Sequence, residues 1–234
     1  MIRNLKVLGL ALVAASVMSA VGASAAQAIP TISWESGATK LTATQEPETS
    51  GGSQLFKITN SSLSVTCNEV HGTVNLPGGV TSASELTTSE ITYTDSTKEA
   101  DHCRGPLGTS PKINMNGCQY NFHITATLKE APNGEGTGTV DIVCPAGKEI
   151  TTEGAACTLH FPAQNGLSHV IYRTVKTTTG AEKEHVTIEP TVSNIKYKHT
   201  GLCGNGEGAD GVYTGNVTVT AEDNLGNPKD VTVT

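Results

Sequence analysis

The sequence predicts an all-β protein with an antiparallel, β-sandwich-like fold that is held together by disulfide bonds. Threonine supplies 34 of the 234 residues, and glycine, serine and valine are also plentiful, a composition that favours strands and turns. Short segments of alternating apolar and polar residues recur about every ten residues, separated by turn-forming residues. The chain also carries an even number of cysteines behind an N-terminal segment typical of exported proteins.

The N-terminal segment has the parts of a signal peptide. Arg3 and Lys6 precede an apolar run over residues 7–21, and small residues follow up to Ala28. This pattern predicts cleavage after Ala28, which leaves residues 29–234 as a secreted, extracellular chain. Cleavage removes two positive charges and no acidic residue, so the net charge changes from −7 to −9.

The charge of the secreted chain bears on its partners. Binding to nucleic acid or to an anionic lipid surface needs clustered Lys or Arg, and no such cluster is present. No second long apolar segment follows residue 28. We therefore expect no nucleic-acid partner and no stable membrane insertion after cleavage, whereas a partner at the cell surface remains open.

The first half of the secreted chain predicts strands separated by turns and one long loop. The expected elements are two strands within residues 30–60 with a glycine-rich break at 50–52, a strand at 61–74 closed by a turn at 76–79, a third stretch at 85–94, and a loop at 95–110 pinned by Cys103.

The clearest strand covers residues 112–128. Its inward parity changes at Gly117, which predicts a β-bulge, because one extra residue re-aims every later side chain. A turn at 132–134 and a return strand at 140–144 complete a predicted hairpin.

The remaining elements continue at the same spacing. They are strands at 157–161, 170–175, 186–188 and 192–197, a hairpin connection at 177–181, a glycine-rich loop at 201–211, and strands at 213–221 and 231–233. The chain forms either one large domain or two stacked halves that meet near residues 130–136.

All the cysteines lie in the secreted part, which predicts three disulfide bonds. Spacing favours a bridge between Cys67 and Cys103. The pairing of the other four cysteines stays open, because Cys144 could pair with Cys118 across a hairpin or with Cys157 across a turn-like segment. The cysteines predicted to form disulfides are Cys67, Cys103, Cys118, Cys144, Cys157 and Cys203.

Several segments, in order, resemble an uncharacterised family of secreted, cysteine-containing, β-rich proteins from soil actinobacteria. They are LTATQ at 41–45, LFKITNSSLSVTC at 55–67, INMNGCQYNFH at 113–123, VDIVCPAGKEI at 140–150 and YTGNVTVTA at 213–221. The resemblance implies a bacterial, secreted β fold and carries over no activity, ligand or catalytic residue. The segment TAEDNLGNPKDVTVT at 220–234 also resembles the last hairpin of bacterial immunoglobulin-like domains.

Metal and cofactor chemistry has little support in the sequence. The histidines, none in a ligand pair with zinc-site spacing, are His71, His102, His123, His160, His169, His185 and His199. Oxygen ligands for calcium cluster in two places, Asn205, Glu207 and Asp210, and then Glu222, Asp223, Asn224, Asn227 and Asp230. Because Asp, Asn and Gly also form tight turns, we expect no metal and no cofactor at either place.

No catalytic motif is present: the sequence has no G-x-S-x-G elbow, no H-E-x-x-H and no odd cysteine. We therefore expect a non-enzymatic protein that binds or builds structure at the cell surface or envelope, and assign no catalytic residue. Two alternatives remain, a secreted hydrolase with a site built from loops 95–111 and 201–211, and a calcium-stabilised adhesion module.

Overall fold

The computed structural model describes residues 29–45, 53–59, 61–95, 102–129, 133–154, 157–177 and 183–234. The predicted signal peptide, residues 1–28, lies outside the described residues, as do 46–52, 60, 96–101, 130–132, 155–156 and 178–182. The strands are β1 (Ile32–Trp34), β2 (Lys40–Gln45), β3 (Gln54–Ile58), β4 (Ser64–Cys67), β5 (Glu69–Asn75), β6 (Ser82–Ala83), β7 (Glu85–Thr87), β8 (Glu90–Thr94), β9 (Lys112–Asn114), β10 (Gln119–Lys129), β11 (Glu135–Val143), β12 (Ile150–Glu153), β13 (Cys157–Phe161), β14 (Gln164–Val175), β15 (His185–Gly201), β16 (Gly206–Thr214), β17 (Val217–Glu222), β18 (Pro228–Lys229) and β19 (Val231–Val233). A 3-10 helix, η2 (Pro106–Gly108), precedes β9.

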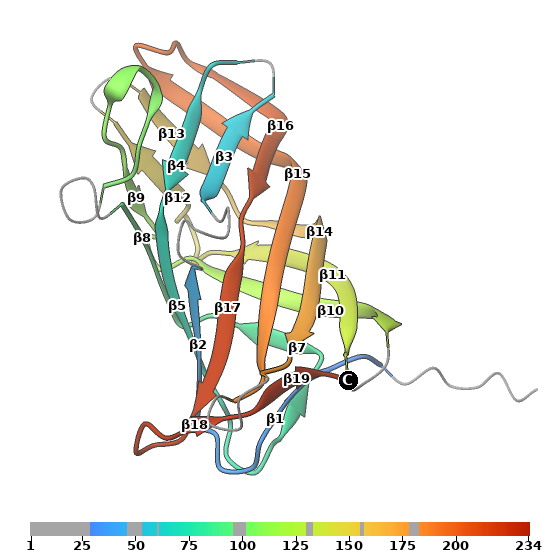
Figure 1. Ribbon diagram of the computed structural model, residues 1–234. Coiled ribbons are helices and arrows are strands. Elements are labelled where there is room, and N and C mark those ends of the chain that lie inside the picture. The colour runs from blue at the N-terminus through green and yellow to red at the C-terminus, as the bar shows by residue number, and fades with distance from the viewer. Residues whose placement is uncertain are drawn as a thin grey trace, which may run out of the picture.

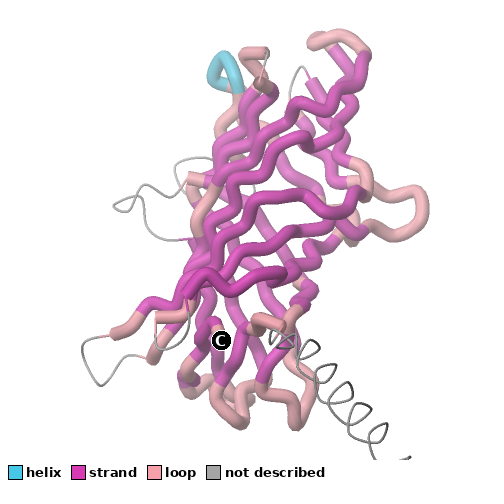
Figure 2. Tube along the Cα trace, turned by 90° about the vertical axis from the view of Figure 1, so that its right-hand side faces the viewer, coloured by secondary structure: helices cyan, strands magenta, loops and turns pink. Residues whose placement is uncertain are grey.

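The predicted antiparallel all-β fold is confirmed (Figures 1 and 2). In the described part of the chain, one sheet of 16 strands consists of two parts that share the long strand β15. The order in the first part is β7-β10-β11-β14-β15-β17-β2-β5-β8. The order in the second part is β4-β3-β16-β15-β13-β12-β9.

Both parts of the sheet curl until their edges are joined by short segments. In the first part, Thr88 donates its backbone N–H to β10 and the next residue, Ser89, donates to β5. In the second part, Arg104 exchanges backbone hydrogen bonds with Thr66 of β4, and His102 forms a β-bridge with Lys112 of β9. The inner faces of both parts therefore surround a common interior.

A small three-stranded sheet, β19-β1-β6, lies at the end of the molecule where the chain finishes (Figure 1). Glu35, next to β1, accepts from Lys183 at 2.8 Å and lies 3.4 Å from the ammonium of Lys229. The Lys183 hydrogen bond is the main cause that lowers the pKa of Glu35 to about 2. These contacts fasten the first described strand to the start of β15 and to β18 near the C-terminus.

The predicted disulfide bonds are present. Cys67 bonds to Cys103, the pairing that the sequence favours, and fastens the segment that joins β4 to β9. Of the two alternatives for Cys144, the structure has the bond to Cys118. The third bridge, Cys157–Cys203, joins the start of β13 to the turn between β15 and β16.

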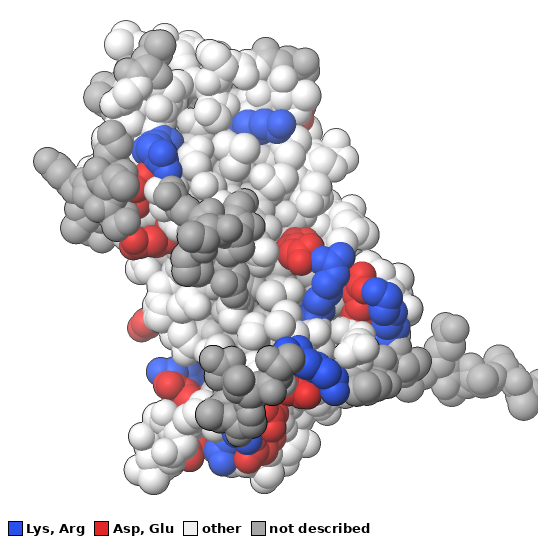
Figure 3. All heavy atoms as spheres, in the orientation of Figure 1, with Lys and Arg blue, Asp and Glu red and all other residues white. Residues whose placement is uncertain are grey.

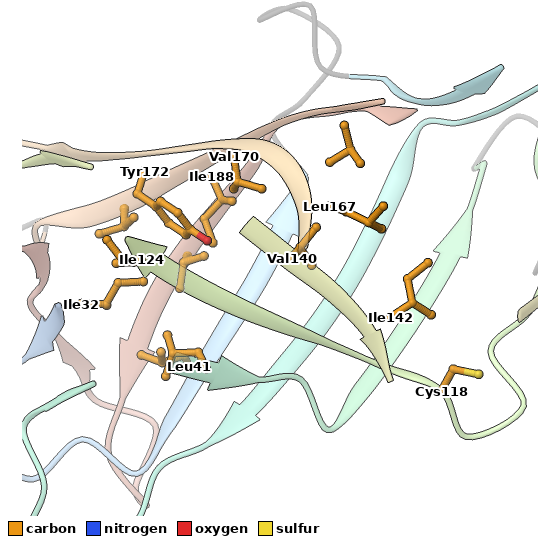
Figure 4. Packing of buried hydrophobic residues seen from close by; sticks show 14 of the residues in the cluster. Ile32, Leu41, Cys118, Ile124, Val140, Ile142, Leu167, Val170, Tyr172 and Ile188 are labelled. Carbon is orange, nitrogen blue, oxygen red and sulfur yellow. The ribbon is translucent and has the colours of Figure 1, made fainter. Parts of the chain in front are cut away.

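The core fills the interior with apolar side chains from most strands. One cluster of buried side chains extends from Ile32 to Val233, and a smaller one surrounds the Cys67–Cys103 bridge. Val170 and Tyr172 on β14 are fully buried, and Figure 4 shows them facing the same interior as Val140 of β11 and Ile188 of β15.

Several local expectations are wrong. The segment at 61–74 is not one strand but two, β4 and β5, which belong to different parts of the sheet. Gly117 is not a bulge: it has φ +81° in a turn, and the strands on either side, β9 and β10, belong to different parts of the sheet. The segments at 186–188 and 192–197 belong to one strand, β15, because its neighbours change along its length while the strand continues. The expected loop at 201–211 is β16 from Gly206 onward.

The surface carries mixed charges. Acidic and basic side chains lie next to one another on the face shown in Figure 3, and several of them form ion pairs, such as Lys40 with Glu222 at 2.5 Å. No helix in the described part of the chain has the length and apolarity needed to cross a membrane.

Candidate ligand-binding cavity

Two small residues on neighbouring strands leave space in the interior. The register places Val219, Ala43, Gly72 and Ile91 side by side across β17, β2, β5 and β8. Ala43 and Gly72 have smaller side chains than the β-branched residues Val219 and Ile91 on either side of them, so the inner face of the sheet is recessed at these two positions. A cavity of about 140 Å³ lies against this part of the wall.

The cavity lies where the two parts of the sheet meet, and its wall is almost entirely apolar. β11 contributes Val140 and Ile142, β14 contributes Leu167, and β15 contributes Ile188, all of which point into the same space in Figure 4. Phe56 and Phe161, whose ring centroids lie 4.6 Å apart, line it from the second part of the sheet. No Asp, Glu, Lys, Arg or His is among the described lining residues.

The main polar feature of this wall is a group of buried side chains. The hydroxyl oxygens of Tyr93 on β8 and Tyr120 on β10 lie 3.0 Å apart. Tyr213 on β16 lines the same cavity as these two tyrosines. Tyr213 donates to Oε1 of Gln54 on β3, and Nε2 of Gln54 donates to the backbone oxygen of Asn216 at 3.0 Å.

The three tyrosines that line the cavity remain protonated. Burial, the largest cause in each case, raises the pKa of Tyr93 and Tyr120 well above the usual value and raises that of Tyr213 as well. A phenol whose pKa is raised is a poor general base at neutral pH. The arrangement is therefore suited to hydrogen bonding and not to proton abstraction.

The histidines that the sequence singles out do not gather at the cavity. His123 Nε2 lies 3.0 Å from Asp141 Oδ2 across the β10–β11 pair, and His160 Nδ1 lies 2.7 Å from Glu149 Oε1. Within the described residues, no group of three or more His, Cys, Asp or Glu side chains is placed to hold a metal ion.

Most of the carboxylates considered for calcium contact groups of the protein itself. Asp223 accepts from the backbone N–H groups of Leu225 and Asn227, both at 2.9 Å, in the turn between β17 and β18. The side-chain hydrogen bond from Asn227 is the largest cause that lowers the pKa of Asp223. Asp210 accepts from the hydroxyl of Tyr197, and Asp230 pairs with Lys183.

The two loops considered for a hydrolase do not build the cavity. None of the described residues within 95–111 or 201–211 lines it. The first segment instead joins the edges of the second part of the sheet, and much of the second segment is strand β16.

Sequence reasoning missed the cavity and its buried tyrosines. Three of the five tyrosines in the chain meet at this one place, although they are far apart in sequence. In the alternating segment 112–128, Tyr120 shares its parity with Phe122 and Ile124, so a buried hydroxyl that needs a partner is a usable signal. The small residues Ala43 and Gly72 gave no such signal, because their effect depends on strand register.

The chain was compared with protein-family models, curated proteins and solved structures. None of them matches.

Proposed function

We propose that the chain is an exported, non-enzymatic binding protein that acts outside the cell, at or near the cell surface, and holds a small uncharged apolar ligand in its central cavity. The observation that carries the proposal is the cavity itself, about 140 Å³ of space with an apolar wall and a few buried hydrogen-bonding groups.

The size of the cavity limits the ligand. A cavity of about 150 Å³ in another protein stays dry when empty and binds benzene, so the space here suits a single ring or a short alkyl chain. Empty space of this volume costs about 3 kcal/mol, at about 24 cal/mol per Å³. A ligand that fills the space would recover part of that free energy, which favours binding.

The chemistry of the wall excludes charged ligands. Moving a carboxylate or an ammonium group from water to an apolar site costs several kcal/mol unless an opposite charge compensates. The described wall offers no such charge. A neutral ligand is therefore favoured over a fatty acid anion or an organic cation.

A non-enzymatic role is favoured because the titratable groups described in the wall are tyrosines with raised pKa values. Export is favoured by the three disulfide bonds, which are compatible with an oxidising extracellular setting. Expression in a bacterial host that secretes the protein, followed by N-terminal sequencing, tests the cleavage site, and a mature chain that begins at Ile29 is expected.

Binding is tested by titrating the mature protein with toluene and with the charged analogues benzoate and benzylammonium. We expect toluene to raise the Tm in a concentration-dependent way, since a ligand that binds only the folded state stabilises it. The charged analogues should leave the Tm unchanged. No effect of toluene, or enzyme-like hydrolysis of generic ester, peptide or glycan substrates, would contradict the proposal.

A further inference from the structure

Tyr120 on β10 is held at the wall of the cavity through its backbone. Its N–H donates to the hydroxyl of Thr88 at 2.9 Å, and the same hydroxyl donates to its carbonyl oxygen at 3.2 Å. Thr88 is buried and belongs to the segment that joins the edges of the first part of the sheet. The Tyr120 ring lies 6.3 Å from that of Phe122, centroid to centroid, and both residues line the cavity. The phenol of Tyr120 is therefore a positioned part of the wall.

The hydroxyl groups of Tyr93 and Tyr120 share one hydrogen bond but carry two hydrogens. A phenol hydroxyl has a single hydrogen to donate and can also accept. Tyr93 donates to Tyr120 over the 3.0 Å between their oxygens, which uses the Tyr93 hydrogen. The Tyr120 hydrogen has no acceptor among the described residues. A buried donor without an acceptor costs free energy, because it has lost its hydrogen bonds to water.

The other polar groups at this wall show the same excess of hydrogens. Tyr213 donates its hydrogen to Oε1 of Gln54. The Gln54 amide, on a side chain that is 2% exposed, donates one of its two hydrogens to the backbone oxygen of Asn216 at 3.0 Å. Its second hydrogen has no acceptor within the described part of the chain. A spare lone pair on an oxygen that already forms one hydrogen bond is a lesser deficit. The wall therefore lacks an acceptor more than it lacks a donor.

From this we infer that the ligand is a small neutral carbonyl compound, a ketone, aldehyde or ester, whose oxygen accepts from the Tyr120 hydroxyl while its hydrocarbon part contacts the apolar wall. A carbonyl oxygen has two lone pairs and no hydrogen of its own. A group that only donates would leave the Tyr120 hydrogen without a partner, and an alcohol would bring a further hydrogen that needs an acceptor. The inference rests on the proposed function and adds to it the chemical class of the ligand.

The test uses two neutral probes of matched shape. Cyclohexanone and methylenecyclohexane have the same ring and the same number of non-hydrogen atoms, and they differ only in carrying C=O or C=CH₂. Dissociation constants are measured by calorimetry for the mature wild-type protein and for Tyr120→Phe, which keeps the ring and removes the hydroxyl. The quantity compared is the affinity for cyclohexanone relative to that for methylenecyclohexane, because the ratio removes general effects of the substitution on the cavity.

We expect this relative affinity to fall about three- to tenfold in Tyr120→Phe, the usual effect of one neutral hydrogen bond. The matched control is Tyr172→Phe, the same change at a buried tyrosine that does not line the cavity, and it should leave the ratio within about twofold. An unchanged ratio in Tyr120→Phe, or an equal fall in Tyr172→Phe, would overturn the inference and leave the proposed function intact. Failure of both probes to bind the folded wild-type protein would instead overturn the proposed function.

Infrared spectroscopy tests the same contact in the wild-type protein, without relying on a variant that folds. A hydrogen bond to the carbonyl oxygen weakens the C=O bond and lowers its stretching frequency. We expect the carbonyl band of bound cyclohexanone to lie at a lower frequency than the band of cyclohexanone dissolved in an alkane. A band at the alkane position, measured for a probe that calorimetry shows to be bound, would overturn the inference. Binding of methylenecyclohexane reports that Tyr120→Phe and Tyr172→Phe are folded.

Discussion

Replacing Ala43 with leucine should fill the cavity and stabilise the protein. Ala43 lies on β2 beside Gly72 of β5, and a Cβ built at Gly72 would lie 3.8 Å from the Ala43 side chain, so both positions face the same space. The larger side chain of Ala43→Leu would extend into the cavity where a ligand is proposed to bind. The variant should therefore gain stability and lose binding together.

The magnitude follows from the added carbons and the space available. Leucine adds three carbon atoms, and burial contributes about 0.8 kcal/mol for each, or roughly 2.4 kcal/mol. Ordering the leucine side chain costs about 0.5–1 kcal/mol. The net gain is about 1.5 kcal/mol, below the roughly 3 kcal/mol that the empty volume of about 140 Å³ costs.

The assay is thermal unfolding with and without toluene. For a chain of this size, a gain of about 1.5 kcal/mol raises the Tm by roughly 3–6 °C. The matched control is Ala209→Leu, the same change at an exposed position on β16, which should leave the Tm and the response to toluene nearly unchanged. A lower Tm for Ala43→Leu combined with an unchanged response to toluene would refute the reasoning, because it would show that this position does not border usable space.

Three further predictions concern stability. Replacing Cys118 and Cys144 together with alanine should lower the free energy of unfolding in urea by about 3.5 kcal/mol, the loop-entropy value for a separation of 26 residues; a loss below about 1 kcal/mol would contradict it. Glu35→Gln should destabilise the protein near neutral pH but not near pH 2. The pKa of Glu35 is 4.5 in the unfolded chain and about 2 in the folded protein. Its carboxylate therefore contributes its full stabilisation above pH 4.5, and this contribution disappears as the pH falls towards 2. A difference in unfolding free energy between variant and wild type that persists near pH 2 would count against this assignment. Gly138→Ala should prevent folding or lower the free energy of unfolding by more than about 3 kcal/mol, because its Cβ would lie 1.7 Å from a carbonyl oxygen of β10. In the same urea assay, Gly72→Ala should be neutral or stabilising by up to about 1 kcal/mol, because the nearest atom to its Cβ would lie at 3.5 Å.

The sequence predicts the fold class because its signals are local. Alternating side chains mark β10, β13 and β17 wherever a strand has one inward face, and turn residues mark the breaks between them. The errors occur where strands change partners. The parity change at Gly117 reports a passage from one part of the sheet to the other, and a bulge in one continuous strand would give the same pattern.

The candidate site could not be predicted in the same way, because it depends on contacts between distant strands. Gln54 and Tyr213 are separated by 159 residues, and the Tyr93–Tyr120 contact joins the edge strand β8 to β10, which lies next to the other edge strand of the first part of the sheet, β7. The spacing of these residues along the chain does not indicate that they are in contact in the folded protein. The pairing of β3 with β16 brings Gln54 to Tyr213, and the closure of the first part by Thr88 and its neighbour brings β8 close to β10.

The cavity and the buried tyrosines together favour binding over structural support. A core selected for stability alone would be served better by a larger residue at position 43, and by phenylalanine in place of tyrosine, since replacing both partners of a buried hydrogen bond with apolar groups is nearly neutral. Instead, unfilled space lies beside buried, hydrogen-bonded hydroxyl groups, in which Tyr93 donates to Tyr120. Each feature alone costs stability or adds none. A neutral, mainly apolar ligand that occupies the space beside these hydroxyl groups accounts for both.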